Sequence, residues 1–204
     1  MKVVLASNNV KKLQELKQIL QPFGWQLIPQ AQLGVPECEE PHYTFVENAL
    51  TKARHASYAT GLPALADDSG LCVEALGGLP GVHSARFAGE PKSDTRNNQK
   101  LLKDLGDNSN RKGRFVAVIV FIRHANDPQP IIAEGEWHGD IMKEERGTGG
   151  FGYDPLFLVP ELGVSSAELA SDEKNRRSHR GQALMQLVKR LQLSFNDTFS
   201  TDTG

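Results

Sequence analysis

Two adjacent carboxylates follow a short apolar run in the stretch Pro63-Ala-Leu-Ala-Asp-Asp-Ser-Gly-Leu71. Residues Pro63 to Ala66 predict a short buried strand, and Asp67 and Asp68 come directly after it. Because open α/β sheets bind ligands beyond the carboxyl ends of their strands, this position favours a ligand site. Adjacent acids repel each other, and Mg²⁺ held by carboxylates and phosphates would remove that cost. The alternative is a solvated turn, since Asp-Ser-Gly is also common turn chemistry.

The composition fits one large domain, or one domain with an inserted lobe: 204 residues, of which 39% are hydrophobic. The charges nearly cancel, with 23 Lys and Arg against 25 Asp and Glu, so non-specific nucleic-acid binding is not expected. Cys38 and Cys72 lie in no CxxC or Cys/His cluster, which predicts free thiols and no zinc site. The sequence shows no leader segment and no apolar run of about 18 residues. We therefore expect a soluble, cytoplasmic protein with no membrane partner.

The chain begins with a strand, a polar loop, a helix and a second strand. Val3 to Ala6 predict the first strand, and Ser7-Asn-Asn9 ends it. An amphipathic helix follows and stops at Gly24, and Trp25 to Ile28 predict the second strand. This order of elements predicts an α/β sheet.

The remaining elements are predicted by caps and by hydrophobic periodicity. Residues 29 to 43 predict a loop. Thr44-x-x-Glu47, which follows it, is a capping box, and the helix that begins there is expected to stop at Gly61. Residues 1–193 are expected to form a single domain, and residues 194–204 a loose polar tail. The other predicted elements are helices over Thr95 to Leu105 and Gln182 to Leu193, and antiparallel strands over Phe115 to Ile122 and Ile131 to Met142.

The loop Ser7-Asn-Asn-Val-Lys-Lys12 lies between the first strand and the first helix. Backbone N–H groups at a helix start bind phosphate, and Lys11 or Lys12 adds a positive charge. The loop is neither a Walker loop nor a GxGxxG motif. The alternative is an Asn cap with surface lysines.

A glycine-rich loop runs from Gly147 to Pro155. Its glycines permit close approach of the backbone to a ligand. Phe151 and Tyr153 offer flat faces for stacking a base, and Asp154 offers an acceptor. The alternative is a tight turn with core aromatics.

Further charged residues fit either a ligand site or a solvated surface. Lys174 and the triplet Ser178-His-Arg180 suit a polyanion or a base carbonyl. Glu39 and Glu40 precede the capped helix, which carries Lys52 and Arg54. Taken alone, each group is more typical of a solvated face.

Five blocks of the sequence together resemble the inosine triphosphate pyrophosphatase family, the RdgB-type house-cleaning enzymes. The resemblance extends over residues 2 to 192. Asn8 is a departure, since many members have Gly there, but Asn tolerates a left-handed backbone better than most residues. The blocks are Ser7-Asn-Asn-x-x-Lys12, Ala66-Asp-Asp-Ser-Gly-Leu71, Gly78-x-Pro-Gly-x-x-Ser-Ala-Arg86, Gly147-Thr-Gly-Gly-Phe-Gly-Tyr-Asp-Pro155 and Ser178-His-Arg-Gly181.

The resemblance implies an α/β fold with a long mixed central sheet flanked by helices and two lobes around a cleft. It implies hydrolysis of ITP, dITP and XTP to the monophosphate and pyrophosphate, with Mg²⁺ as cofactor, and a homodimer. Asp68 would be the general base, and Glu40 and Asp68 the metal ligands. The implied substrate-binding residues are Ser7, Asn8, Asn9, Val10, Lys11, Lys12, Lys52, Asp67 and Ser69 on the phosphate side, and Phe151, Gly152, Tyr153, Asp154, Lys174, His179 and Arg180 on the base side.

Selectivity for hypoxanthine and xanthine would follow from the C6 edge of the base. Both bases carry a carbonyl acceptor there, where adenine has an amino donor. Donors such as His179, Arg180 or backbone N–H groups would pair with the carbonyl and leave adenine mismatched.

Three other functions remain open. A Maf-like pyrophosphatase acting on other nucleotides shares the strand-loop-helix start, although the glycine loop and the Ser178 block argue against it. A nucleotide-sensing module without turnover is the second alternative, and the acid pair beside a basic loop argues for chemistry instead. A nucleic-acid binder is the third, and the balanced charge disfavours it.

Overall fold

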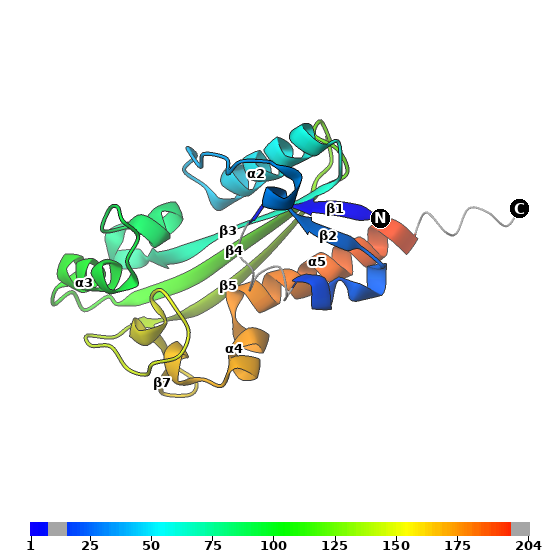
Figure 1. Cartoon of the computed structure of the whole chain (residues 1–204). Coiled ribbons are helices and arrows are strands. Elements are labelled where there is room, and N and C mark those ends of the chain that lie inside the picture. The colour runs from blue at the N-terminus through cyan, green and yellow to red at the C-terminus, as the bar shows by residue number, and fades with distance from the viewer. Residues whose placement is uncertain (8–15, 197–204) are drawn as a thin grey trace, which may run out of the picture. The chain divides into compact units, whose positions relative to one another are not determined.

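The computed structural model describes residues 1–7 and 16–196, and its centre is a seven-stranded mixed sheet (Figure 1). The strand order is β2-β1-β3-β4-β5-β6-β7. β1 pairs in parallel with β2 and β3, whereas β6 pairs antiparallel with β5 and β7. The strands are β1 (Lys2–Leu5), β2 (Gln26–Pro29), β3 (Ala64–Val73), β4 (Lys112–Ile122), β5 (Ile131–Ile141), β6 (Phe157–Val159) and β7 (Val164–Ser165).

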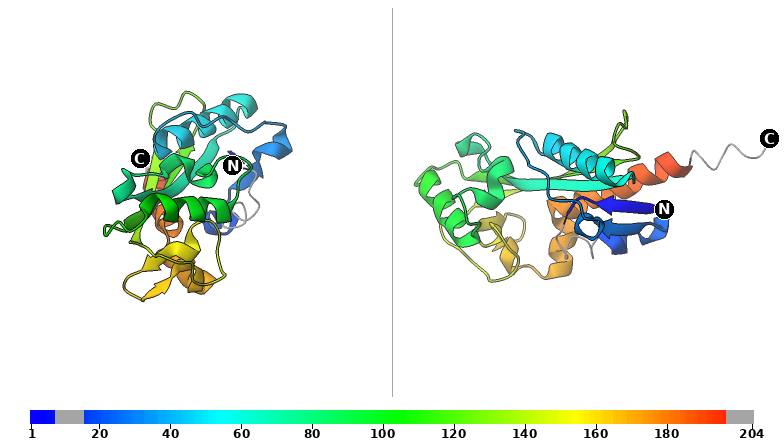
Figure 2. Two further views of the ribbon diagram at one scale, coloured as in Figure 1. Left: turned by 90° about the vertical axis from the view of Figure 1, so that its left-hand side faces the viewer. Right: turned by 45° about the horizontal axis from the view of Figure 1, so that its top comes forward.

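Helices flank this sheet, and Figure 2 gives two further views of their arrangement. The predicted α/β class with a mixed central sheet is therefore confirmed. The predicted cleft stays a prediction. The α-helices that the structure describes in full are α2 (Phe45–Thr60), α3 (Asp94–Leu105), α4 (Ser171–Arg177) and α5 (His179–Asn196). Short 3₁₀ helices lie at Gln21–Phe23, Gln30–Leu33, Glu74–Leu76, Gly81–Arg86, Asp154–Leu156 and Ser166–Glu168.

α2 has the boundaries that the sequence predicts. Thr44 Oγ1 accepts a hydrogen bond from the backbone N–H of Glu47 at 3.3 Å, and Gly61 ends the helix in a left-handed conformation with φ 68°. Such caps satisfy backbone groups that the helix leaves without a partner. Ala49, Ala53 and Ala56 of α2 are fully buried, so the helix packs closely along the face that carries them.

The chain divides into two compact units. Unit 1 comprises residues 1–68, 118–134 and 183–204, and unit 2 comprises residues 69–117 and 135–182. Unit 1 is built on the fully buried strand residues Val3, Val4 and Leu5, and Trp25 stacks on Phe121 with ring centroids 4.7 Å apart.

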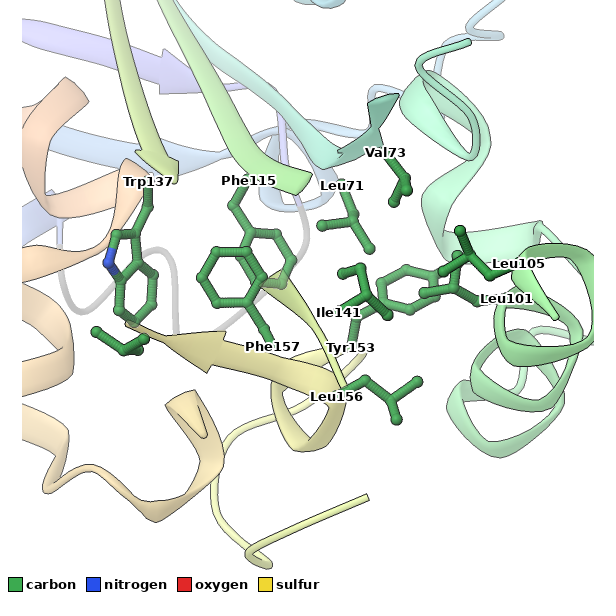
Figure 3. Packing of buried hydrophobic residues seen from close by; sticks show 11 residues of the cluster. Leu71, Val73, Leu101, Leu105, Phe115, Trp137, Ile141, Tyr153, Leu156 and Phe157 are labelled. Atoms are coloured by element: carbon green, nitrogen blue, oxygen red, sulfur yellow. The ribbon is translucent and has the colours of Figure 1, made fainter. Parts of the chain in front are cut away.

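Unit 2 has an aromatic core (Figure 3). The Phe157 ring lies 4.6 Å from the Phe115 ring and 5.3 Å from the Trp137 ring, centroid to centroid. Leu101 and Leu105 of α3 join this core, and so does Tyr153. The core therefore connects α3 with the end of the glycine loop.

The acid pair does not follow a strand, which corrects the prediction from the sequence. β3 runs from Ala64 to Val73, so Asp67 and Asp68 lie inside it. Ser69 and Gly70 continue the strand, and Gly70 is not among the glycines with positive φ. The turn alternative is therefore wrong as well. Pairing with neighbouring strands outweighs the low strand propensity of Asp, Ser and Gly.

Two smaller predictions also differ from the structure. The predicted loop over residues 29 to 43 contains the 3₁₀ helix Gln30–Leu33. The last helix begins at His179 and continues to Asn196, past the predicted end at Leu193. Cys38 and Cys72 are free, as predicted. Within residues 1–7 and 16–196, no helix has the length and hydropathy needed to cross a membrane.

Asp127 closes the hairpin between β4 and β5. It is 1% exposed and accepts hydrogen bonds from the backbone N–H groups of Arg123 and Gln129, both at 2.9 Å. The Arg123 guanidinium donates two more, at 2.8 and 2.5 Å. Hydrogen bonds from the Arg123 side chain, followed by those from the backbone, hold the pKa of Asp127 well below its usual range.

We expect Asp127→Asn to lower the free energy of unfolding at neutral pH by about 1–3 kcal/mol, because the amide leaves charged donors badly paired. A lowered carboxyl pKa stabilises the folded state above the pKa of the unfolded chain, and this stability is lost as the pH falls. Urea denaturation should therefore show the difference between wild type and variant shrinking from about pH 5 downwards. Asp107→Asn is the control, because its side chain is fully exposed. A difference that stays constant down to about pH 2 would contradict this prediction.

Candidate active site

In unit 1, the Lys52 ammonium lies between two carboxylates. Lys52 is near the middle of α2, and its Nζ contacts Glu40 Oε1 and lies 3.7 Å from Asp68 Oδ1. The three side chains are 15%, 27% and 11% exposed, respectively, so water screens their charges only in part. A helix, a loop and a strand thus bring three predicted site residues together.

The charges around Lys52 decide its protonation. Burial alone would lower the pKa of Lys52, but the charge of Asp68, the hydrogen bond with Glu40 and the charge of Asp67 outweigh it and raise that pKa. Lys52 is therefore a stable cation at neutral pH. Cys38 lies at the edge of this group, where burial, and then the charge of Glu40, raise the pKa of its thiol. Cys38 is therefore a neutral thiol and not a nucleophilic thiolate.

The donor set around Lys52 fits Mg²⁺. Glu40 and Asp68 present carboxylate oxygens to one positive charge, and such hard oxygen donors are those that Mg²⁺ prefers. Over the described residues, no three or more His, Cys, Asp or Glu side chains lie close enough to form a metal site by themselves. An ion at these two carboxylates would need water or phosphate as its other ligands, which is the usual coordination of Mg²⁺.

The first loop continues from the end of β1. The Ala6 N–H donates to the Leu65 carbonyl at 2.8 Å, so the chain enters Ser7 beside β3. Ser7 is half-buried. The other predicted phosphate ligands, Asn8, Asn9, Val10, Lys11 and Lys12, lie outside the described residues.

In unit 2, the Phe151 ring is the exposed aromatic surface of the glycine loop. Phe151 is 60% exposed. Lys174 Nζ lies 5.1 Å from the ring centroid, and the Arg180 guanidinium carbon lies 5.9 Å from it. These distances are within the range of cation–π attraction. Three predicted residues from separate segments therefore meet at one ring.

The Asp154 carboxylate is bound to other groups of the glycine loop and its neighbours. Its carboxylate is buried and accepts hydrogen bonds from the Phe151 N–H and the Ser166 hydroxyl, both at 2.8 Å, and it contacts Lys174 Nζ. Gly150 has φ +76°, and a Cβ there would overlap the Asp154 carboxylate. Asp154 therefore holds the loop together, and its predicted contact with a base stays a prediction.

Tyr153 lies in the core of unit 2 and not on the surface. It is 4% exposed, and its hydroxyl donates to the Ser84 carbonyl at 2.8 Å. Burial, and then the charge of Asp94, raise the pKa of Tyr153. Of the two predicted stacking faces, the Phe151 ring is exposed and the Tyr153 ring is not.

The Ser178-His-Arg block starts α5. Ser178 is buried, and its Oγ accepts a hydrogen bond from the Gly181 N–H at 3.1 Å, which is a helix cap. The His179 ring stacks on Phe115 with centroids 4.9 Å apart and an interplanar angle of 15°. A Cβ at Gly181 would overlap the Asn175 carbonyl, so only glycine fits this junction with α4.

Two residues that sequence reasoning missed contact the glycine loop. Asp94 and Asn98 of α3 bond the backbone of Gly152. Their spacing of four residues places them on one face of the helix. That spacing alone does not tell which loop the face meets, so this contact cannot be predicted from the sequence.

The Ham1 family model matches residues 3–190 of the chain. Among its relatives, the dITP/XTP pyrophosphatase of Ralstonia nicotianae is 59% identical over 96% of this chain and 98% of the relative. That of Nitrosomonas europaea is 59% identical over 97% of this chain and 96% of the relative.

Two solved structures are also similar. A HAM1 protein from Coxiella burnetii has a TM-score of 0.92 at 49% identity and covers 95% of this chain and 99% of its own. The Ham1 protein of Staphylococcus aureus has a TM-score of 0.87 at 38% identity and covers 97% of this chain and 100% of its own. These matches confirm the resemblance found in the sequence: this chain belongs to the Ham1 family.

Proposed function

We propose that this chain hydrolyses the non-standard purine nucleoside triphosphates ITP, dITP and XTP to the monophosphate and pyrophosphate, and so cleanses the nucleotide pool. The observation that carries the proposal is 59% identity, over nearly the full length of both chains, to two dITP/XTP pyrophosphatases. The acid–lysine group of unit 1 and the exposed aromatic of unit 2 support it, because one suits a polyphosphate and the other a base.

Asp68 is the proposed general base. Hydrolysis at the α-phosphorus needs a base to position and deprotonate water and needs charge neutralisation at the leaving pyrophosphate. The Lys52 ammonium contacts Glu40 and lies 3.7 Å from Asp68 Oδ1, so its positive charge offsets the negative charge of the two carboxylates. Lys52 also supplies positive charge for the departing pyrophosphate.

Mg²⁺ is the proposed cofactor, and Glu40 and Asp68 would hold it. When bound with the substrate phosphates, it would supply charge neutralisation and lower the pKa of a coordinated water. Ser7 and the residues up to Lys12 are the proposed triphosphate contacts, with Asp67 and Ser69 beside the base Asp68. Backbone N–H groups and lysines suit that role.

Phe151 is the proposed stacking surface for the purine. His179 and Arg180 are the proposed donors to the C6 carbonyl of hypoxanthine or xanthine, with Lys174 beside them. Adenine has an amino group at this position and would leave these donors unpaired. We further propose a cytoplasmic homodimer with no nucleic-acid or membrane partner. The balanced charge supports the absence of a nucleic-acid partner.

The products of ITP hydrolysis test the proposal. We expect inosine monophosphate and pyrophosphate in the presence of Mg²⁺, no turnover with EDTA, and much slower cleavage of ATP. Chromatography of the products and a panel of nucleoside triphosphates would measure this. Inosine diphosphate with phosphate as products would refute the reaction. Equal efficiency with ITP and ATP would refute the account of selectivity, and a preference for modified pyrimidines would favour the Maf-like alternative.

A further inference from the structure

Two side chains of α3 hold both backbone groups of Gly152. The Gly152 N–H donates to Asp94 Oδ2 at 2.7 Å, and the Gly152 carbonyl accepts from Asn98 Nδ2 at 3.2 Å. Asp94 and Asn98 are one helical turn apart and therefore share a face of α3. We call these two residues the α3 clamp.

The surroundings of Asn98 fix the orientation of its amide. Nδ2 also donates to Glu145 Oε1 at 3.0 Å, and because both partners are acceptors the nitrogen must face them. Asn98 is 3% exposed, and its Oδ1 meets no hydrogen-bond donor in the part of the chain that the structure describes. A buried acceptor without a donor lowers stability. Asn98 is thus better explained by the bond to Gly152 than by its contribution to the core.

Gly152 matters because it follows Phe151. The Phe151 ring is largely exposed, so core packing does not determine its position. Its own N–H is held by Asp154 at 2.8 Å, and the next residue, Gly152, is held by the α3 clamp. Gly152 has φ +62°, a backbone conformation that other residues rarely adopt. The place of the ring is therefore set by backbone hydrogen bonds on its two sides.

We propose that Asp94 and Asn98 are positioning residues for the purine base. They act through Gly152 on the Phe151 ring and set the affinity for the base without contacting the substrate. The inference rests on the proposed function, in which Phe151 stacks the base. A preorganised aromatic surface binds more tightly because ordering it on binding costs free energy.

Asp94→Ala and Asp94→Asn test the proposal, with Asp104→Ala as the matched control. Asp104 lies on the same helix, and its Oδ2 accepts a surface hydrogen bond from Lys100 Nζ at 2.7 Å. Ser93 still caps α3 in all three variants, because its Oγ accepts from the Arg96 N–H. We expect Asp94→Ala to raise KM for ITP about tenfold with kcat nearly unchanged, as for loss of one charge-assisted hydrogen bond. Asn keeps an acceptor oxygen, so Asp94→Asn should restore most of the affinity.

Binding of the product halves separates base from phosphate. Calorimetry should show weaker binding of inosine monophosphate to Asp94→Ala and unchanged binding of pyrophosphate. Amide hydrogen exchange should speed up over residues 150–153 in Asp94→Ala and not in Asp104→Ala. Faster exchange without weaker inosine monophosphate binding, unchanged exchange, or equal weakening of both ligands would each overturn the proposal. Failure of wild type to cleave ITP would refute the proposed function alone, because these binding measurements do not depend on turnover.

Discussion

Asp68→Asn is expected to lower kcat for ITP by about 10²- to 10⁴-fold, the usual contribution of a general base. The amide keeps the size of the side chain but cannot take a proton from the attacking water. Asp68 lies inside β3, and its Oδ1 is 3.7 Å from the Lys52 ammonium, whose positive charge attracts the carboxylate. Steady-state kinetics with ITP and pyrophosphate detection would measure the loss.

Glu39→Gln is the matched control for Asp68→Asn. Glu39 is exposed and directly precedes Glu40, the ion-pair partner of Lys52. Its substitution therefore removes one nearby negative charge without removing the proposed base. We expect its kcat to stay close to that of wild type. A near-normal rate for Asp68→Asn, with Glu39→Gln also unaffected, would end the assignment of Asp68 as the base.

Local interactions explain which parts of the fold the sequence predicts well. α2 begins after Thr44 and ends at Gly61, as predicted, because both caps are bonds between residues at most four positions apart. α3 is predicted to within one residue, and Ser93 caps it in the same way. Such bonds can be predicted from one segment of the chain without knowing which other segments pack against it.

Non-local interactions explain the error at β3. The residues Asp67 to Gly70 have low strand preference, so the sequence predicts a strand that ends at Ala66. In the structure, β3 lies between β1 and β4 in the sheet and continues through this polar stretch, beyond its pairing with β1 at Ala64 and Leu65. Pairing of strands distant in sequence cannot be derived from the preferences of four residues.

The sequence predicts a set of site residues but not their arrangement. Phe151 and Tyr153 are two residues apart with similar chemistry, and nothing local indicates which ring is buried. The left-handed backbone at Gly150 and Gly152 and the core around Tyr153 decide it. The contact of Lys52 with Glu40 likewise joins residues twelve positions apart.

Asp154→Ala is expected to lower the free energy of unfolding by about 3–5 kcal/mol, the usual cost of removing one partner of a buried ion pair. The substitution leaves Lys174 without its buried carboxylate and removes an acceptor from the Phe151 N–H and from the Ser166 hydroxyl. Because the same bonds hold the Phe151 ring, KM for ITP should rise too. Urea denaturation and steady-state kinetics on the same protein would measure both effects.

The two roles of Asp154, contacting the base and holding the loop, predict different effects on stability and on KM. Glu173→Ala is the control, since Glu173 pairs with Arg177 on the same short helix as Lys174, but at the surface, where such pairs contribute about 0–1 kcal/mol. A carboxylate that only contacts the base would leave stability like that of the control and change KM alone. A carboxylate that holds the loop must change both, because its hydrogen bonds are already made in the absence of substrate. Unchanged stability in Asp154→Ala would therefore return Asp154 to the base-contacting role that the sequence suggested.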